Sequence, residues 1–330
     1  MSKINVCSEW GELKEVVIGR PLDEDDCIFE WTTGMDQEFS WLKPDTFRFL
    51  KENSGKPWKN ANPELFAKIN DQVGYYVDTL GKHGVTVHRP DRLVNEDRNY
   101  INRGIEQIWP RDCFCTVGST VIVASLRMPW KRKQQFSLAR LYTQKLLAGE
   151  CTYVSAPQPS TEILSTNTHE AEKTAILLDG GDFLVHGRDI YLGQGHGSNA
   201  LGARFAQAAL GEEYQVYPLK LADAALHLDC TIALVRPGLG IICRDWLVSE
   251  LPPALQRFTW IEATAEEAAW LGVNGLPLNP ETYLVDAAHT RIIRELRSHG
   301  VEVVEVPFDG PSYLGGSLRC ASQPLIRQEI

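Results

Sequence analysis

The sequence predicts an α/β fold made of five ββαβ units arranged around a pseudo-fivefold axis. The first observation is a recurring pattern in which an amphipathic helix, a glycine or polar break and a short strand rich in β-branched residues follow one another. The second is a β-hairpin pattern, two apolar runs around a turn, that precedes most of these segments. Repetition of this kind indicates a repeat architecture. A doubly wound α/β sheet is the competing interpretation.

Five segments carry the helix–strand pattern, and the similarity is closest where His-Gly-Val at 83–85 recurs at 299–301. The segments are 73–90, 138–156, 201–219, 290–308 and a shorter version at 251–263. In the full-length versions the glycine between helix and strand suits the position after the last helical residue.

Four hairpin patterns lie upstream of these segments, at 113–126, 182–193, 231–244 and 276–286. The remaining segment, 73–90, is preceded by the single strand "LKEVVIGRP". We expect the C-terminal "LRCASQPLI" (318–326) to be its partner, so that strands from both chain ends close the fifth unit. Residues 1–330 would then form one domain.

Composition limits the classes of partner. The net charge of −10, with no basic run beyond "KRK" at 131–133, argues against nucleic acid or an anionic membrane and would tolerate a cationic small substrate. There is no apolar stretch of membrane-spanning length and no targeting segment at the N-terminus. Eight cysteines without a CxxC pair predict reduced thiols and a cytoplasmic protein.

Cys320 is a candidate nucleophile. A lone cysteine in an apolar run is more often a small buried hydrophobic residue. Here, however, Gly315 and Gly316 would permit close approach by a ligand, and Arg319 would favour the reactive thiolate. A nucleophilic cysteine needs a base from elsewhere in the chain. We expect His227 in "LHLDC" to be that base, on a strand that also directs Asp229 to the same ligand.

Acidic residues stand at equivalent places in the repeated units. Asp112, Asp182 and Asp229 come directly before the first strands of three hairpins, and Cys320 lies in the strand that completes the fifth unit. We therefore expect these side chains to converge at one end of the pseudo-fivefold axis. The alternatives are a local ion pair for Asp112, a surface turn for Asp182 and a buried His–Asp contact for His227 and Asp229. The set lacks HExxH or paired histidines, so we predict no metal and no cofactor.

Four motifs in order, "WPRD" (109–112), "DGGDF" (179–183), "LHLD" (226–229) and "GGSLRC" (315–320), resemble the amidinotransferase family. This family includes the glycine and inosamine-phosphate amidinotransferases and shares a guanidino-modifying superfamily with the arginine deiminases. The ending is most similar to that of the bacterial secondary-metabolism members. The resemblance implies a five-bladed α/β propeller.

The same resemblance implies the catalytic roles. Cys320 would be the nucleophile, His227 the general acid and base, and Asp182 the carboxylate that orients the imidazole. The implied reaction moves the amidino group of L-arginine through an amidino-cysteine to a primary amine, with ornithine released and ping-pong kinetics. Arginine deiminase-like hydrolysis and a non-catalytic guanidinium-binding protein are the alternatives.

The resemblance also implies how the donor is bound. Asp112 and Asp229 would bind the guanidinium, since carboxylates pair well with this planar cation. Arg244 or Arg236 would hold the donor's carboxylate, and Asn274 stands where some members have a substrate-binding serine. The segments 29–49 and 165–173 would form the walls that select the acceptor amine. The sequence leaves the acceptor, and any homo-oligomer, unspecified.

Overall fold

The described residues form a mixed α/β fold with five separate three-stranded sheets. The computed structural model describes residues 3–32, 34–100, 104, 107–160, 163 and 173–329, with the backbone alone at 37 and 38. Since the strands of this described part fall into five sheets, the alternative of one doubly wound sheet is wrong, and the prediction of five similar units is confirmed.

Four of the sheets have the same plan: an antiparallel pair of consecutive strands, followed by a third strand parallel to the second. The strands are β3 (Phe114–Val117), β4 (Thr120–Val123) and β5 (Thr152–Ser155); β6 (Phe183–His186), β7 (Asp189–Gln194) and β8 (Gln215–Lys220); β9 (Ile232–Arg236), β10 (Leu239–Ile242) and β11 (Thr259–Glu262); and β12 (Leu276–Pro277), β13 (Thr282–Asp286) and β14 (Glu302–Val306).

The fifth sheet joins the two ends of the chain, as predicted. Strand β1 (Glu12–Ile18) pairs antiparallel with β15 (Ser322–Gln328), and Ile18 lies opposite Ser322. On its other side β1 pairs in parallel with β2 (Thr86–His88). Cys320 lies in the turn just before β15. Because β15 pairs with β1, this turn has the same place in its sheet as the turn before the first strand has in the other sheets.

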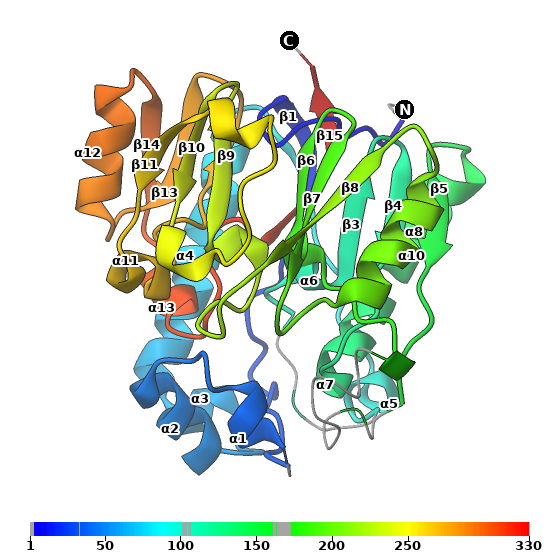
Figure 1. Ribbon diagram of the computed structural model, residues 1–330. Helices are drawn as coiled ribbons and strands as arrows, with labels where there is room; N and C mark the ends of the chain where they lie inside the picture. Colours follow the sequence, from blue (N-terminus) through cyan, green and yellow to red (C-terminus); the bar gives the residue numbers. More distant parts are fainter. Residues whose placement is uncertain are drawn as a thin grey trace.

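Long helices connect the second and third strands of four sheets. They are α4 (Pro63–Lys82), α8 (Ala139–Leu147), α10 (Ala200–Leu210) and α12 (Thr290–Ser298). In α12 the buried residues Ile292, Ile293 and Leu296 follow helical spacing, so one face packs on the core. Figure 1 shows α8, α10 and α12 on the outside of the molecule.

The predicted helix at 251–263 is replaced by a single 3-10 turn, η6 (Leu255–Arg257), before β11. Pro252 and Pro253 open this segment. Proline supplies no backbone N–H, and the residue before a proline is disfavoured in the helical region. These residues therefore limit the connection to a short turn.

The other helices of the described residues occupy the remaining loops. They are α1 (Met35–Glu38), α2 (Pro44–Glu52), α3 (Trp58–Ala61), α5 (Asn95–Arg98), α6 (Pro110–Cys113), α7 (Pro129–Arg132), α11 (Ala265–Ala269), α13 (Asp309–Ser312) and the 3-10 helices η1 (Lys133–Leu138), η3 (Gly180–Asp182), η4 (Leu228–Cys230) and η5 (Arg244–Trp246). In Figure 1 both chain termini lie at the top, whereas α1, α2, α3, α5 and α7 gather at the bottom. None of the helices in the described ranges combines the length and the apolar character needed to cross a membrane.

Candidate active site

Short helical turns directly before the first strands of the sheets carry most of the candidate residues. Asp112 lies in α6 before β3. Asp179 precedes η3 and Asp182 ends it, before β6. His227 precedes η4 and Asp229 lies in it, before β9. Cys320 ends the turn that leads into β15. The repeated strand arrangement thus presents one turn from each of several sheets to a common region.

One cavity, with an empty volume of about 680 Å³, receives four of these side chains: Asp112, Asp179, His227 and Cys320. The rest of its wall is largely aromatic or aliphatic, formed by Phe29, Phe39, Trp41, Trp109, Met128, Trp130, Leu226 and Leu314. Phe29 stacks on Phe39 and on Trp130, with ring centroids 5.1 and 4.8 Å apart. These four side chains therefore share a cavity whose remaining wall is mostly apolar, with Arg127, Lys131 and His196 as its other charged or polar side chains among the described residues.

The segment predicted to form an acceptor wall, 29–49, contributes Phe29, Phe39 and Trp41 to this cavity. Of the other predicted wall, 165–173, residues 165–172 lie outside the described residues.

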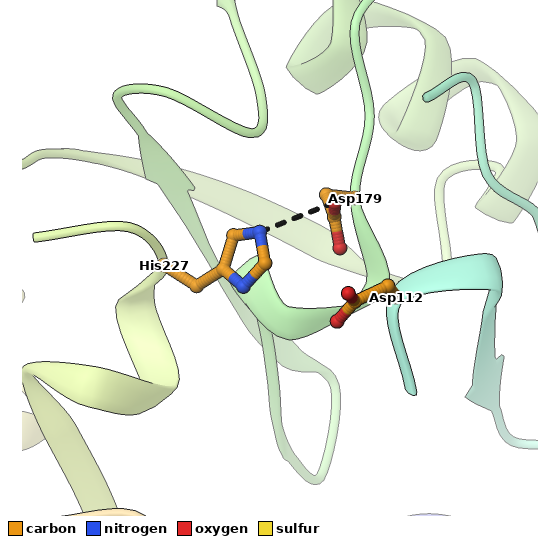
Figure 2. A group of neighbouring side chains, drawn as sticks. All are labelled: Asp112, Asp179 and His227. Carbon is orange, nitrogen blue, oxygen red and sulfur yellow. Dashed lines mark ion pairs between the residues drawn. The ribbon is translucent and has the colours of Figure 1, made fainter. Parts of the chain in front are cut away.

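His227 and Asp179 form a buried ion pair, with Nε2 of the imidazole 3.1 Å from Oδ2 of the carboxylate. Figure 2 shows both side chains beside Asp112. The other oxygen of Asp179 accepts a hydrogen bond from the backbone N–H of Gly181 at 3.2 Å, which fixes the carboxylate. Gly181 and Gly197 make room for the ring, because a Cβ at either position would lie within 2.8 Å of an imidazole nitrogen. The "DGGD" sequence thus provides both the partner and the space for His227.

The charges of this cluster stabilise one another. Burial disfavours the imidazolium, but the carboxylates of Asp179, Asp182 and Asp112 outweigh burial and hold the pKa of His227 well above its ordinary value. For Asp179, burial acts to raise the pKa, yet the imidazolium lowers it below the usual range. Burial raises the pKa of Asp112 in spite of its ion pair with Lys131. The imidazolium of His227 and the carboxylate of Asp179 therefore stabilise each other's charged forms.

The prediction that Asp182 orients the imidazole is wrong, since the carboxylate paired with the ring is Asp179. Asp182 is fully buried behind the histidine. Its Oδ1 accepts from the backbone N–H of Leu228 at 2.9 Å and its Oδ2 from the Ser198 hydroxyl at 2.6 Å. Burial raises its pKa to about 7. Asp182 thus holds the backbone next to His227 and not the ring.

The His-x-Asp pattern predicted that His227 and Asp229 share one face of a strand. This is wrong, because His227 precedes the short 3-10 helix η4 and Asp229 lies in it. The carboxylate of Asp229 accepts from Nη1 of Arg319 at 2.8 Å. Both Nε and Nη2 of Arg319 donate to Glu9, at 3.1 and 3.0 Å. Asp229 is not among the described residues that line the cavity, and its contact with the donor guanidinium stays a prediction.

This buried network also fixes the charge of Glu9. Burial alone would raise the pKa of Glu9, but Arg319 and Arg111 hold it at about 2. Arg319 and Asp229 in turn flank Cys320, whose Sγ lies 3.8 Å from Oδ2 of Asp229. The network anchors Arg319, the neighbour of Cys320 in the chain, to the interior of the protein.

Asn274 is a positioning residue and does not line the cavity. Its Oδ1 accepts from the backbone N–H of Cys320 at 3.1 Å, and its Nδ2 donates to the backbone oxygen of Asp229 at 3.1 Å. The backbone oxygen of Asn274 also accepts from the N–H of Arg319. Asn274 thus fixes the turn of Cys320 against the turn of Asp229, and its contact with the substrate stays a prediction.

The two arginines predicted to hold the donor's carboxylate lie away from the cavity. Arg244 is half exposed and pairs with Glu262 at 2.7 Å, and Arg236 donates to the backbone oxygen of His299 at 2.6 Å. Arg127 is the arginine that lines the cavity, together with Lys131. Sequence reasoning missed Arg127 because it follows the hairpin of β3 and β4 and has no counterpart in the other units.

Asp112, Asp179 and His227 each offer one ligand atom, and these atoms lie within 4.8 Å of one another. A metal ion would find two carboxylates and one imidazole there. The ammonium of Lys131 already pairs with Asp112, and the surrounding carboxylates raise the pKa of His227, so the cluster favours cations that donate hydrogen bonds. A planar guanidinium meets that description.

Comparison with known proteins identifies similar chains. No protein-family model matches this sequence. The inosamine-phosphate amidinotransferase 1 of Streptomyces glaucescens is 27% identical over 360 residues, covering 98% of this chain and 96% of its own length. An L-arginine:L-lysine amidinotransferase of Pseudomonas savastanoi pv. phaseolicola is 25% identical over 357 residues, covering 98% of this chain and 94% of its own. Both of these sequence relatives are amidinotransferases by name.

Solved structures share the fold. SxtG, an amidinotransferase from Microseira wollei in the saxitoxin biosynthetic pathway, superposes with a TM-score of 0.83 at 22% identity, covering 99% of this chain and 98% of its own. The DDAH of Pseudomonas aeruginosa, solved with citrulline, has a TM-score of 0.65 at 18% identity and covers 95% of this chain and 99% of its own.

Proposed function

This chain belongs to the amidinotransferase family of transferases, and we propose that it moves the amidino group of L-arginine through Cys320 to a primary amine. The observation that carries the proposal is the cavity in which Cys320, His227, Asp112 and Asp179 meet. The arginine donor has support from the relative that is named as an arginine:lysine enzyme. A role in secondary metabolism has support from the inosamine-phosphate and saxitoxin-pathway relatives.

In the first half-reaction the thiolate of Cys320 attacks the central carbon of the guanidinium. The bond from that carbon to the side-chain nitrogen of the donor breaks, and the imidazolium of His227 gives this nitrogen a proton. Ornithine leaves, and the amidino group stays on sulfur. The high pKa of His227 suits this step, because the histidine begins it as the acid.

In the second half-reaction the neutral nitrogen of the acceptor amine attacks the amidino carbon. His227, now neutral, takes a proton from that nitrogen, and the bond from carbon to sulfur breaks. The thiolate of Cys320 and the imidazolium are restored. Asp179 stabilises the imidazolium at the start and end of the cycle, and we therefore assign it the orienting role.

Asp112 and Asp179 are the carboxylates that face the cavity, and we assign them to the guanidinium of the donor. The guanidinium would then share Asp112 with Lys131. We assign the carboxylate of arginine to Arg127, since a guanidinium pairs with a carboxylate through two parallel hydrogen bonds.

The structural similarity to DDAH, solved with citrulline, supports hydrolysis as a second candidate function. Transfer requires that the amidino-cysteine survive until an amine arrives, so water must be kept out. The aromatic walls of the cavity favour that requirement. A non-catalytic guanidinium-binding protein would need no such cysteine beside the acids.

We also infer that the five sheets form the blades of one α/β propeller and that residues 1–330 are one catalytic domain. Two observations support this inference: the common strand order of the sheets, and the closure of one sheet by strands from both chain ends.

Product analysis tests the proposed function. With labelled L-arginine and a set of primary amines, transfer predicts ornithine in equal amount to a guanidinylated amine. Citrulline and ammonia in place of ornithine would establish hydrolysis. If arginine binds but neither ornithine nor citrulline is formed, the result would favour a non-catalytic guanidinium-binding protein.

A further inference from the structure

A second cavity adjoins the active-site cavity and has an empty volume of about 380 Å³. We call it the annex; Trp41, Leu226 and Gly315 line both cavities. At its inner end the annex reaches Cys230. The thiols of Cys230 and Cys320 contact opposite oxygens of one carboxylate, at 3.6 Å from Oδ1 and 3.8 Å from Oδ2 of Asp229. The annex therefore ends beside the nucleophile.

The walls of the annex are apolar and carry little charge. Apart from the three shared residues they include Trp246, Ala268 and Leu271. Among the described residues that line the annex, Lys43 is the one charged side chain and none is acidic. By contrast, Asp112 and Asp179 line the active-site cavity. An ammonium group is thus disfavoured in the annex and favoured in the active-site cavity, whereas an apolar group is favoured in the annex.

We propose that the annex binds the body of the acceptor, and that the acceptor is a primary amine carried on an extended apolar chain or ring. The proposal rests on the proposed amidino transfer and names the substrate class of its second half-reaction. The amine nitrogen points into the active-site cavity toward Cys320, and the apolar body lies between Trp41 and Leu271. Asymmetry of charge between the two cavities sets this orientation.

The chemistry of the walls disfavours a polar acceptor. Lys43, Thr46 and Tyr313 are the side chains with charged or hydroxyl groups among the described residues that line the annex, so a polyhydroxylated amine would bury most of its oxygens against alanine, leucine and indole faces. A short amino acid such as glycine would leave the annex empty. An apolar body gains by leaving water, since each buried methylene group adds to binding.

Two probes of equal length test the proposal: hexylamine and 2-(2-aminoethoxy)ethanol. We expect kcat/KM for hexylamine to exceed that for the ether alcohol by about tenfold or more, because the buried methylene groups are replaced by oxygens in the second probe. Binding of each amine is measured separately by calorimetry with the unreacted protein. This readout does not depend on turnover.

Ala224→Trp supplies the test of location. Ala224 is an exposed residue on the rim of the annex, so a larger side chain fills the annex with little effect on folding. We expect weaker binding and at least about tenfold lower kcat/KM for hexylamine, with ornithine release in the first half-reaction unchanged. Ala208→Trp, on the exposed face of α10, is the matched control and should behave as wild type.

Equal use of the two probes, or hexylamine binding that Ala224→Trp leaves unchanged, would overturn the annex as the acceptor site. The proposed function fails differently, by the absence of an amidino group on Cys320 whatever amine is added. In that case hexylamine binding lost in Ala224→Trp and kept in Ala208→Trp would still establish the annex as a site for an apolar amine.

Discussion

The imidazole of His227 pairs with Asp179, at 3.1 Å between Nε2 and Oδ2, and leaves Asp182 to bind the backbone of Leu228 and the hydroxyl of Ser198. The two carboxylates belong to one Asp-Gly-Gly-Asp turn but have different roles. Asp179 pairs directly with the imidazole, whereas Asp182 binds the backbone beside it and adds to the negative charge that raises the pKa of His227.

Asp179→Asn should therefore lower activity more than Asp182→Asn. Loss of the paired carboxylate removes a negative charge that raises the pKa of His227, so the acidic form is depleted at neutral pH. We expect a fall in kcat of about 10²–10⁴-fold, the usual range for loss of acid–base catalysis, and a shift of the alkaline limb of the pH–rate profile to lower pH. The measurement is kcat against pH for both variants. A larger loss, or the larger shift, in Asp182→Asn would contradict these assignments.

Arg127→Ala should raise KM for L-arginine, because the variant lacks the guanidinium assigned to the donor's carboxylate. An increase of about 10–100-fold is expected for one charged hydrogen-bond pair, and KM for agmatine, which lacks the carboxylate, should change little. Arg244→Ala is the control, since Arg244 is half exposed and paired with Glu262 outside the cavity. If Arg244→Ala alone raised KM for arginine, the assignment to Arg127 would be wrong.

Arg319→Met should destabilise the fold. The buried guanidinium pairs with Glu9 and Asp229, and its loss leaves two buried carboxylates without their partner. Removing one side of such a network costs about 3–5 kcal/mol in free energy of unfolding. Denaturant unfolding measures this loss. The matched surface variant is Arg297→Ala, which breaks an exposed pair with Glu305 and should cost less than about 1 kcal/mol. Equal effects would mean that the network contributes no stability.

Asp182 should make stability depend on pH in a specific direction. Its pKa of about 7 in the folded protein lies above the ordinary value of 3.8, so the folded state binds its proton more tightly than the unfolded state. The stabilising contribution of this proton is complete at low pH and is lost as pH rises toward 7. From about pH 5 to about pH 8 the free energy of unfolding of wild type, relative to Asp182→Asn, should fall on the order of 3 kcal/mol. Parallel curves for the two proteins would show that Asp182 keeps an ordinary pKa.

The repeated pattern of helices and hairpins predicted the five sheets because every unit buries its own apolar faces with the same local signals. It also predicted the pairing of β1 with β15, since a lone strand near each chain end had no other partner. The helix at 251–263 was predicted wrongly because the repeat outweighed Pro252 and Pro253 in our interpretation.

The candidate site was harder to predict, since hydrogen bonds inside it join turns from different sheets. The residue types of "DGGD" and "LHLD" do not distinguish Asp179 from Asp182 as the partner of His227; only the contact of its Nε2 with Asp179, made across two turns of the chain, identifies the partner. The positioning role of Asn274 and the part played by Glu9 were recognisable only from their contacts with Cys320 and Arg319, which lie 46 and 310 residues away in the chain. A pattern confined to one segment carries no signal for such contacts.

The central claim is that the sulfur of Cys320 carries the amidino group between donor and acceptor. Intact-protein and peptide mass spectrometry after incubation with L-arginine, without any amine, measures this directly, with Cys230→Ala as a control that retains Cys320. We predict one amidino group per chain on Cys320, formed with an equal amount of ornithine and removed by an acceptor amine. An unmodified Cys320 in protein that makes ornithine, or an adduct that persists in Cys320→Ala, would contradict this claim.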